Sequence, residues 1–409
     1  MDILPRPMYL NRLKDYIDKP QIKILTGIRR SGKSSVLMLI RQELLSRGIE
    51  ADRIIHLNLE SLLYTHLHQA SALYEHLQQQ IIKNTKYYIL LDEIQEVKDW
   101  EKAVNSFLVD FDVDVYLTGS NSHLLSSELA TYLAGRYVEI PIYTLSFAEF
   151  LTFRSHYVSG QPKDPLPEFL QYLRMGGFPV IHTANYTEEA AYKVIYDIYS
   201  SVILRDTVQR HKIRDVELLE RVVKYVFDNI GNSFSGKNVA DYFKSQQRKT
   251  DLNTVYNYLY ALEGAFIIYR TPRYDVKGKE LLKTHEKFYV SDPSIIYSVM
   301  GYRDRMIAGI LENIVLLELK RRDFHVFVGK LDDKEIDFIA EKAGEKLYIQ
   351  VTYKLENENT VAREFNPLLA IKDQYPKYVV SMDDVWKDSI EGVKHLYITD
   401  FLLSDSLIP

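Results

Sequence analysis

The stretch IKILTGIRRSGKSS, residues 22–35, places a short apolar run directly before the pattern G-x-x-x-x-G-K-S. The apolar run predicts a buried strand, and the segment KSSVLMLIRQELLSRG behind it predicts a helix that ends near Gly48. A glycine-rich turn between a strand and a helix directs backbone N–H groups at phosphate oxygens, and the helix dipole adds to the attraction. The stretch therefore predicts a P-loop that binds a nucleotide.

Each residue type in this loop has an expected role. Gly27 and Gly32 let the backbone turn inward, Lys33 reaches the β- and γ-phosphates, and Ser34 offers its hydroxyl to Mg²⁺. ATP and Mg²⁺ are therefore the predicted cofactors. The residues expected to bind the nucleotide are Gly27, Ile28, Arg29, Arg30, Ser31, Gly32, Lys33, Ser34 and Ser35.

A second apolar run, KYYILLDEIQEV (residues 86–97), ends in two acidic residues about 60 positions after the P-loop. This is the form of a Walker B segment. Asp92 is predicted to hold Mg²⁺ through water, and Glu93 to polarise the attacking water. An acid pair on the protein surface is the alternative interpretation of the same residues.

Two further catalytic candidates follow in the next strand and beyond it. The segment VDVYLTGSNS (residues 113–122) predicts a strand that ends in polar residues, so Ser120 or Asn121 could lie beside the γ-phosphate as a sensor. A plain polar turn is the alternative. Arg136 is a candidate for stabilising the charge that develops on the phosphates, and a solvated arginine is its alternative.

Composition excludes several classes of protein. The net charge of -5 gives no overall attraction to nucleic acid, and the absence of cysteine excludes disulfides, thiolate catalysis and cysteine-bound zinc. The first residues lack the pattern of a signal peptide, and no apolar run approaches the roughly 18 residues that cross a bilayer. We therefore expect a cytoplasmic protein without membrane contact, of two to four domains, and an oligomer remains open.

Four segments together resemble a large prokaryotic family of AAA-like ATPases that carry a C-terminal domain of unknown function. They are residues 27–35, 87–95, 116–150 and 172–181. The family is similar to the signal-transducing (STAND-type) branch of P-loop ATPases, which implies slow turnover and the use of ATP as a conformational switch.

The same resemblance implies where the adenine lies. In that branch a G-x-P motif in a helical lid contacts the base, and Gly177, Phe178 and Pro179 match it, although a plain turn is the alternative. Arg6 and Tyr9, which precede the P-loop, are also expected near the base.

The predicted fold class is α/β, with four parts. These are a P-loop ATPase core with a parallel sheet (1–155), a helical lid and connector (156–215), a winged-helix-like domain (216–290) and a restriction-endonuclease-like α/β domain (291–409).

The winged-helix part is a candidate DNA-binding module. Between residues 201 and 290 there are 16 Lys and Arg against 11 Asp and Glu, although the whole chain is acidic. Arg248 and Lys249 are candidates for phosphate contacts, and Asn253 and Asn257 for contacts with base edges. The hairpin after the third helix is predicted to be the wing. A packing or protein-binding module is the alternative interpretation.

The last part resembles the restriction-endonuclease-like fold, in which an acid on a helix, an Asp on one strand and E-x-K on the next hold Mg²⁺. Glu312, Asp337, Gln350 and Lys354 are the matching candidates, and Thr352 stands where that fold has lysine. A neutral Gln attracts Mg²⁺ less than a carboxylate does, and Lys354 would have to reach past Thr352. The residues therefore predict a degenerate nuclease site that does not cleave DNA.

The leading functional prediction is an ATP-binding and ATP-hydrolysing switch that couples its nucleotide state to binding of DNA or a protein partner. An ATP-gated DNA-processing nuclease is the first alternative. A transferase or metabolic kinase is the second, and it is disfavoured because the sequence contains no recognisable acceptor-binding motif.

Overall fold

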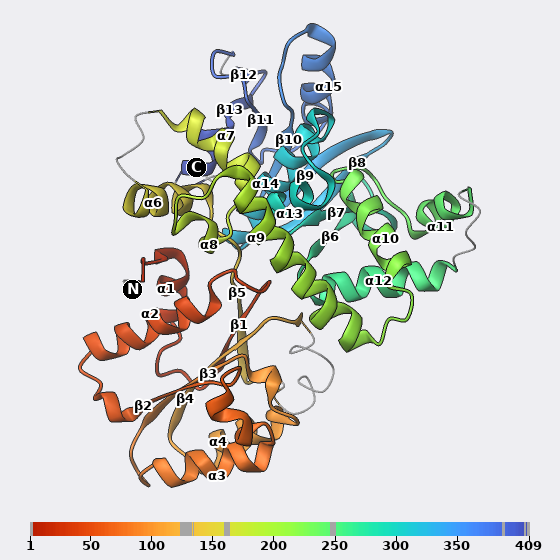
Figure 1. Ribbon diagram of the computed structural model, residues 1–409. Helices are drawn as coiled ribbons and strands as arrows, with labels where there is room; N and C mark the ends of the chain where they lie inside the picture. Colours follow the sequence, from red (N-terminus) through yellow and green to blue (C-terminus); the bar gives the residue numbers. More distant parts are fainter. Residues whose placement is uncertain are drawn as a thin grey trace. The chain divides into compact units, whose positions relative to one another are not determined.

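The computed structural model describes residues 3–122, 133, 135–158, 164–245, 251–386, 389–404 and 406 (Figure 1). The chain forms two compact units. The first comprises residues 1–143 with 264–266, and the second comprises residues 144–263 with 267–409. Arg248 and Lys249, the predicted phosphate contacts, lie outside the described residues.

The first unit is built on a five-stranded parallel sheet with the strand order β2-β3-β4-β1-β5. The prediction of an α/β core with a parallel sheet is therefore confirmed. Strand β4 lies between β1, which leads into the P-loop, and β3, which ends in the acid pair. The elements are α1 (Pro7–Lys14), β1 (Ile22–Thr26), α2 (Lys33–Ser46), η1 (Ala51–Arg53), β2 (Ile54–Asn58), η2 (Leu62–Leu67), α3 (Ala70–Gln80), β3 (Tyr87–Asp92), η3 (Ile94–Glu96), α4 (Trp100–Asp110), β4 (Val113–Gly119) and β5 (Tyr137–Pro141).

Helices cover both faces of this sheet, as Figure 1 shows for α1 and α2 on one side and α3 and α4 on the other. Alternate residues of β3 enter the two cores: Ile89 packs with α3 and α4, while Leu90 packs with α1 and α2. Because both faces are covered, strands β1 and β3 are buried along their whole length. This explains why they appear in the sequence as continuous apolar runs.

The second unit begins with a set of helices. Helix α6 belongs to this unit, although the sequence predicts a P-loop core that extends to residue 155. Phe147 of α6 packs edge-on against Phe169 of α7, with ring centroids 5.4 Å apart. The helices are α6 (Phe147–Tyr157), α7 (Pro165–Met175), α8 (Pro179–His182), α9 (Glu188–Ser201), the π-helical segment η5 (Val202–Gln209), α10 (Val216–Asp228), α11 (Gly236–Ser245), α12 (Leu252–Gly264), α13 (Pro293–Met300), η6 (Asp304–Met306), α14 (Ile307–Arg321), α15 (Glu358–Leu369) and α16 (Ile398–Leu403).

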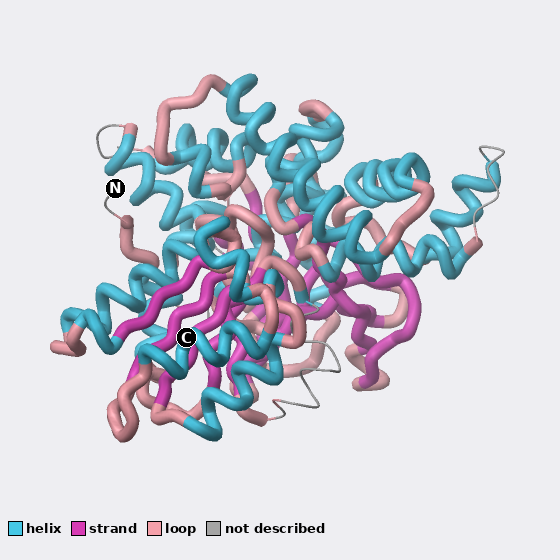
Figure 2. Tube along the Cα trace, turned by 60° about the horizontal axis from the view of Figure 1, so that its bottom comes forward, coloured by secondary structure: helices cyan, strands magenta, loops and turns pink. Residues whose placement is uncertain are grey.

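The described strands of the second unit form one mixed sheet of eight strands in the order β12-β13-β11-β10-β9-β8-β6-β7. Figure 2 shows the strands in magenta and the helices in cyan. The strands are β6 (Ile268–Asp275), β7 (Glu280–Val290), β8 (His325–Leu331), β9 (Lys334–Lys342), β10 (Glu345–Val351), β11 (Lys377–Ser381), β12 (Ser389–Ile390) and β13 (Val393–Tyr397).

The hairpin predicted as the wing has a different place in the fold. Strands β6 and β7 do pair in antiparallel fashion, but β6 also pairs in parallel with β8, through Arg273–Asp275 and Val328–Lys330. The hairpin is therefore part of the large sheet and not a free wing. The physical reason is burial: Phe288, Tyr289 and Val290 are buried in this unit, whereas a solvent-exposed wing needs polar side chains.

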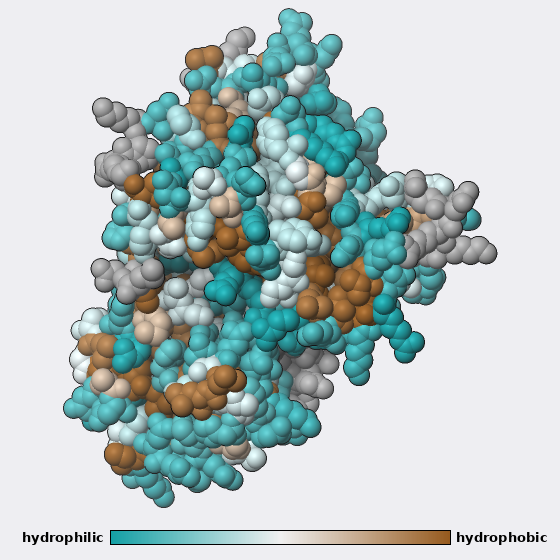
Figure 3. All heavy atoms as spheres, viewed as in Figure 1, coloured by the Kyte–Doolittle hydropathy of each residue, from teal (hydrophilic) through white to brown (hydrophobic). Residues whose placement is uncertain are grey.

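The surface drawn in Figure 3 carries several separate brown, apolar patches among hydrophilic side chains. In the described part of the chain, the helices are too short or too polar to span a bilayer.

Candidate functional site

The P-loop backbone between β1 and α2 requires its two glycines. Gly27 has φ +141°, and a Cβ there would lie 2.2 Å from the carbonyl oxygen of Ile142. Gly32 has φ +98° and forms the N-terminal cap of α2. Side chains at these positions would strain or block the turn, so the loop keeps the close-packed backbone that a phosphate cradle needs.

The ammonium group of Lys33 lies across this loop. Its Nζ donates to the carbonyl oxygens of Gly27 at 3.0 Å and Ile28 at 3.2 Å, and it is 3.9 Å from Oε1 of Glu93. The side chain is only 3% exposed. Neutral carbonyls are weak partners for a cation, so phosphate oxygens would replace them favourably.

Asp92 and Ser34, the two predicted Mg²⁺ ligands, are in contact. The Asp92 carboxylate accepts hydrogen bonds from the hydroxyls of Ser34 and Thr118. Burial raises the pKa of Asp92, and the neighbouring charge of Glu93 raises it further, whereas the two hydroxyls lower it. A divalent cation beside Asp92 would favour its charged form, so these two oxygen donors fit Mg²⁺.

Thr118 is a site residue that the sequence did not single out. Its hydroxyl on β4 accepts from the backbone N–H of Glu93 at 2.8 Å and donates to Asp92 at 2.5 Å. Glu93 itself has left-handed backbone angles, with φ 55°, and its carboxylate accepts from the amide of Gln95. The sequence feature that indicates a site here is the polar end of β4, and it predicts Ser120 and Asn121 as site residues and not Thr118.

The other predicted catalytic residues lie in different surroundings. Ser120 and Asn121 are fully buried at the end of β4. Arg136 is exposed, and its guanidinium donates to Oδ1 of Asn105 on α4 at 3.0 Å. The roles of Asn121 as a sensor and of Arg136 as a charge-stabilising group therefore stay predictions.

Three further residues of the loop have different surroundings. Arg29 pairs with Glu60 at 3.0 Å between N and O. Arg30 is exposed and has a left-handed φ of 65°, and Ser35 is exposed at the start of α2. Their predicted contacts with the nucleotide stay predictions.

Arg6 and Tyr9 pack against the backbone of the P-loop and of the segment after β5. The guanidinium of Arg6, which is 2% exposed, donates to the carbonyl oxygens of Ser31 at 2.9 Å and Tyr143 at 3.0 Å. It also lies 4.5 Å from the ring centroid of Tyr9. Because both side chains are buried against the backbone, the structure gives them a supporting role. Their expected contact with the base stays a prediction.

The G-x-P motif is a packed turn of the second unit. The backbone N–H of Gly177 donates to Oδ2 of Asp292 at 2.8 Å, and a Cβ on Gly177 would lie 2.4 Å from the carbonyl oxygen of Leu145. Phe178 is fully buried, and Pro179 begins α8. These contacts explain the glycine and the phenylalanine within the unit, and the contact of Pro179 with adenine stays a prediction.

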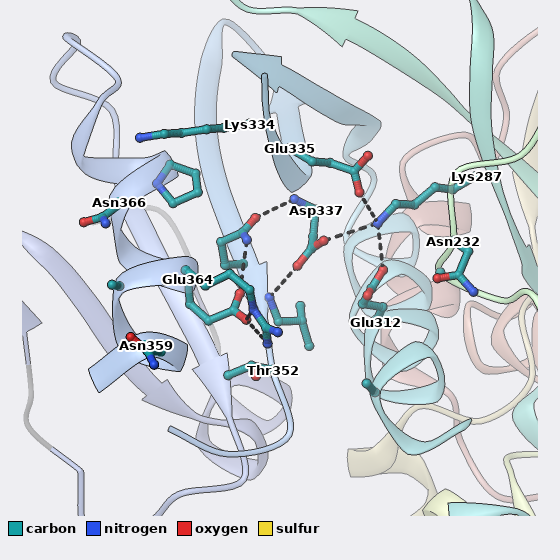
Figure 4. A pocket seen from close by; sticks show the side chains of 17 residues that line it. Asn232, Lys287, Glu312, Lys334, Glu335, Asp337, Thr352, Asn359, Glu364 and Asn366 are labelled. Carbon is teal, nitrogen blue, oxygen red and sulfur yellow. Dashed lines mark hydrogen bonds and ion pairs between the residues drawn. The ribbon is translucent and has the colours of Figure 1, made fainter. Parts of the chain in front are cut away.

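A polar pocket of about 690 Å³ in the second unit contains most of the predicted nuclease residues. Figure 4 shows Lys287 of β7 pointing into a group of carboxylates. Its Nζ lies 3.1 Å from Glu312, 2.9 Å from Glu335 and 3.2 Å from Asp337. The sequence did not indicate Lys287, because it stands in the predicted wing, 50 residues before Asp337.

The charges in this pocket depend on one another. Burial, together with the charge of Asp337, raises the pKa of Glu312 to about 8. Burial disfavours the charged form of Lys287. The surrounding anionic side chains outweigh this effect and raise the pKa of Lys287 well above its usual value. The pocket therefore keeps a buried ammonium among the carboxylates.

The remaining nuclease candidates divide into two groups. Gln350 accepts from the backbone N–H of Asp337 at 2.7 Å and donates to Glu364 at 3.2 Å, and Thr352 also lines the pocket. Lys354 does not line it, and its Nζ lies 3.7 Å from Glu356 instead. Among the described residues no group of three or more His, Asp or Glu side chains is arranged to hold a metal ion.

Comparison with known proteins agrees with the P-loop geometry. A family model described as an AAA domain matches residues 19–151, and a domain of unknown function (DUF8612) matches residues 166–306. The fold of the Walker-type ATPase of Pyrococcus abyssi is similar, with a TM-score of 0.52 and 16% identity over 73% of this chain and 96% of that one. The chain thus contains an AAA-type P-loop domain, which implies ATP binding.

Two relatives match over most of their length. An uncharacterized protein of Haemophilus influenzae is 39% identical over 98% of this chain and 99% of the relative. An uncharacterized protein of Methanocaldococcus jannaschii is 32% identical over 86% of this chain and 79% of the relative. The chain therefore belongs to the same family as these two uncharacterized proteins, and its residues 19–151 form an AAA domain.

Proposed function

We propose that this protein is an ATP-binding and ATP-hydrolysing switch, in which the P-loop unit senses the nucleotide and the second unit binds DNA or a protein partner. The observation that carries the proposal is the hydroxyl of Thr118, which joins Asp92 to the backbone of Glu93. This hydroxyl would couple the carboxylate that holds Mg²⁺ to the backbone of the residue that polarises water. A change at the nucleotide would therefore reach both acids together.

The residues have separate tasks in this proposal. The backbone of the P-loop and the ammonium of Lys33 would hold the phosphates, and Ser34 and Asp92 would hold Mg²⁺. Mg²⁺, when bound, supplies positive charge that offsets the charge of the phosphate oxygens. Glu93 would orient and polarise a water molecule, and its buried position keeps its carboxylate away from bulk solvent.

A switch is favoured over a transferase or a metabolic kinase by the site itself. The polar groups around the P-loop would serve the phosphates, the metal and a water molecule, and the sequence contains no recognisable motif for a second substrate. The second unit is larger than the P-loop unit, which suits a part that reads out the nucleotide state.

Hydrogen exchange tests the coupling between the units. Backbone exchange would be followed by mass spectrometry without nucleotide, with ATP and with ADP, in the wild type and in Lys33→Ala. We expect ATP to change protection of segments in residues 144–263 of the wild type, and to change nothing in Lys33→Ala. Protection changes confined to residues 1–143 would contradict a switch that reaches the second unit.

The alternative, an ATP-gated nuclease, would place catalysis in the pocket around Asp337. Metal-dependent cleavage of DNA needs carboxylates that are available to a divalent cation. Here the ammonium of Lys287 lies within 3.2 Å of Glu312, Glu335 and Asp337. We propose that Lys287 balances their charge in place of a metal, and that this part of the chain serves binding or regulation.

A further inference from the structure

We propose that the second unit binds single-stranded nucleic acid in a pocket between helix α12 and residues 210–215. This inference rests on the proposed function in one respect: it names the partner whose binding the nucleotide state would control.

The pocket has a volume of about 390 Å³ and two distinct walls. Helix α12 supplies Asn257 and Tyr260, and the segment that follows the π-helix η5 supplies Lys212 and Arg214. A π-helical stretch is rare and frequently lies next to functional sites. The volume suits a small polar group such as one nucleotide base with its phosphate.

Two contacts hold the walls together. The phenol of Tyr258 donates to the carbonyl oxygen of Asp215 at 3.3 Å. The ring of His211 meets the ring of Tyr260 edge-on, with centroids 6.2 Å apart and planes at 88°. The shape of the pocket is therefore fixed by packing within the second unit.

Three cations lie on the second wall or directly before it. Arg210, Lys212 and Arg214 are exposed, and within the described ranges none of them forms an ion pair. By contrast, exposed Arg221 on α10 pairs with Glu217 at 2.8 Å. Asp215 also lines the pocket, so the three cations exceed the acidic side chains of this wall and leave a local positive potential that attracts phosphate groups.

The exposed face of α12 adds the groups that contact bases. Asn253, Tyr256, Asn257 and Tyr260 are exposed and follow the spacing i, i+3, i+4, i+7, so they share one side of the helix. Tyr256 is 41% exposed and Tyr260 is 56% exposed. Tyr260 lines the pocket and offers its ring for stacking on a base, whereas the tip of the Tyr256 ring already lies against Gly236 of α11.

This combination favours a nucleic acid over an acidic peptide. A peptide carboxylate would use the cations but would neither stack on the ring of Tyr260 nor pair with the amide of Asn257 in the way that a base does. Bases in a duplex are stacked on one another, so their faces are hidden from a tyrosine ring. An unpaired strand exposes both the base faces and the phosphates, and therefore matches all three kinds of side chain.

Fluorescence anisotropy with a labelled oligothymidylate tests the inference. We expect the full-length protein to bind the oligonucleotide more tightly than a duplex that contains it. Tyr260→Leu should weaken binding by about 5- to 100-fold. The double variant Lys212→Gln, Arg214→Gln should reduce the slope of log affinity against log salt by about 1.4.

Arg221→Gln is the matched control, because it removes an exposed cation of the same unit that is already paired. It should leave the affinity unchanged. The double variant Lys212→Arg, Arg214→Lys keeps the charges and should keep the salt slope, which separates loss of charge from loss of folding. Equal affinity of the wild type and Tyr260→Leu, tighter binding of the duplex, or inorganic polyphosphate binding as tightly as the oligonucleotide would overturn the proposal.

The same titrations with Lys33→Ala distinguish this inference from the proposed function. Loss of ATP binding with intact oligonucleotide binding leaves the pocket proposal standing and shows that binding does not need the nucleotide. A wild type that binds ATP but no oligonucleotide refutes the pocket proposal and leaves the ATPase proposal untouched.

Discussion

The ammonium of Lys287 lies 3.2 Å from the carboxylate of Asp337, although the two residues come from strands β7 and β9. Strands β6 and β8 stand between these two strands in the sheet. Lys287 lies opposite Thr271, outside the stretch Arg273–Asp275 through which β6 pairs with β8, so its side chain meets the acidic group where the strands are not paired side by side. This contact makes the hairpin of residues 268–290 part of the same site as the last hundred residues.

Removing this ammonium should destabilise the second unit. Lys287→Met would leave Glu312, Glu335 and Asp337 without their shared cation, and breaking such a buried pair costs about 3–5 kcal/mol of unfolding free energy. Urea unfolding followed by tryptophan fluorescence measures the effect. The chain has two tryptophans, so a Trp100→Phe background leaves the signal to Trp386 in the second unit.

Lys277→Met is the control for this measurement. Lys277 pairs with Asp332 at the surface, and an exposed pair contributes less than about 1 kcal/mol. A similar small loss in both variants would mean that Lys287 does not balance the charge of the pocket.

Incubation of the wild type with Mg²⁺ and plasmid DNA should produce no cleavage, with or without ATP. The reason is the ion pairing of Lys287 with the carboxylates that a metal would need. Agarose gels report nicking and linearisation. Cleavage that persists in Asp337→Ala would come from a contaminating nuclease, whereas cleavage that this variant abolishes would restore the nuclease interpretation.

The P-loop predictions separate binding from hydrolysis. Lys33→Ala should weaken ATP binding at least about 10-fold, because it removes a charge-assisted contact with the phosphates.

Glu93→Gln should keep the affinity for ATP and slow ATP hydrolysis about 100-fold, since it removes a base and no ligand. Calorimetry and phosphate release measure the two effects, with Lys102→Ala as a control at an exposed lysine that pairs with Asp99. Unchanged ATP affinity in Lys33→Ala would refute the nucleotide site.

Thr118→Val should impair ATP hydrolysis more than ATP binding. Valine has the same shape but leaves the buried N–H of Glu93 without its acceptor, which costs about 1–3 kcal/mol, and it frees the Asp92 carboxylate from one donor. Thr118→Ser retains the hydroxyl and should keep most of the activity. Equal turnover in the valine and serine variants would show that the bridge has no role in catalysis.

The stability of the second unit should fall as pH rises from 6.5 to 8.5. The pKa of Glu312 is about 8 in the folded protein and 4.5 in the reference state, so the folded state binds this proton more tightly. Its contribution is complete below pH 4.5 and is lost as pH rises through 8. Glu312→Gln cannot titrate and should flatten the dependence, measured by the urea midpoint of the Trp386 signal.

The choice of pH range avoids a second titrating group. Burial lowers the pKa of His182 to about 4, so its contribution is present above pH 6.5 and is lost only as pH falls toward 4. A midpoint that rises between pH 6.5 and 8.5 in the wild type would contradict the expected sign for Glu312.

The sequence by itself determined the nucleotide-binding part of this protein. A P-loop is a local structure, because its glycines, its lysine and the helix that follows them are neighbours in the chain. Strand β1 before it is covered on both faces and therefore appears as an apolar run. Asp92 could be predicted from the sequence for the same reason, since it ends the continuous apolar strand β3. The order of neighbouring residues in the sequence is enough to predict these parts of the site.

Only the tertiary structure decided which distant residues share a site. Thr118 contacts Asp92 because β4 pairs with β3, and the order of residues in the sequence does not show which strands pair. Lys287 reaches Asp337 because β6 joins β8 in the large sheet, which turns a predicted wing into a sheet edge. Hydrogen bonds between strands and the burial of apolar faces select these partners, and both depend on the whole folded chain and not on neighbours in sequence.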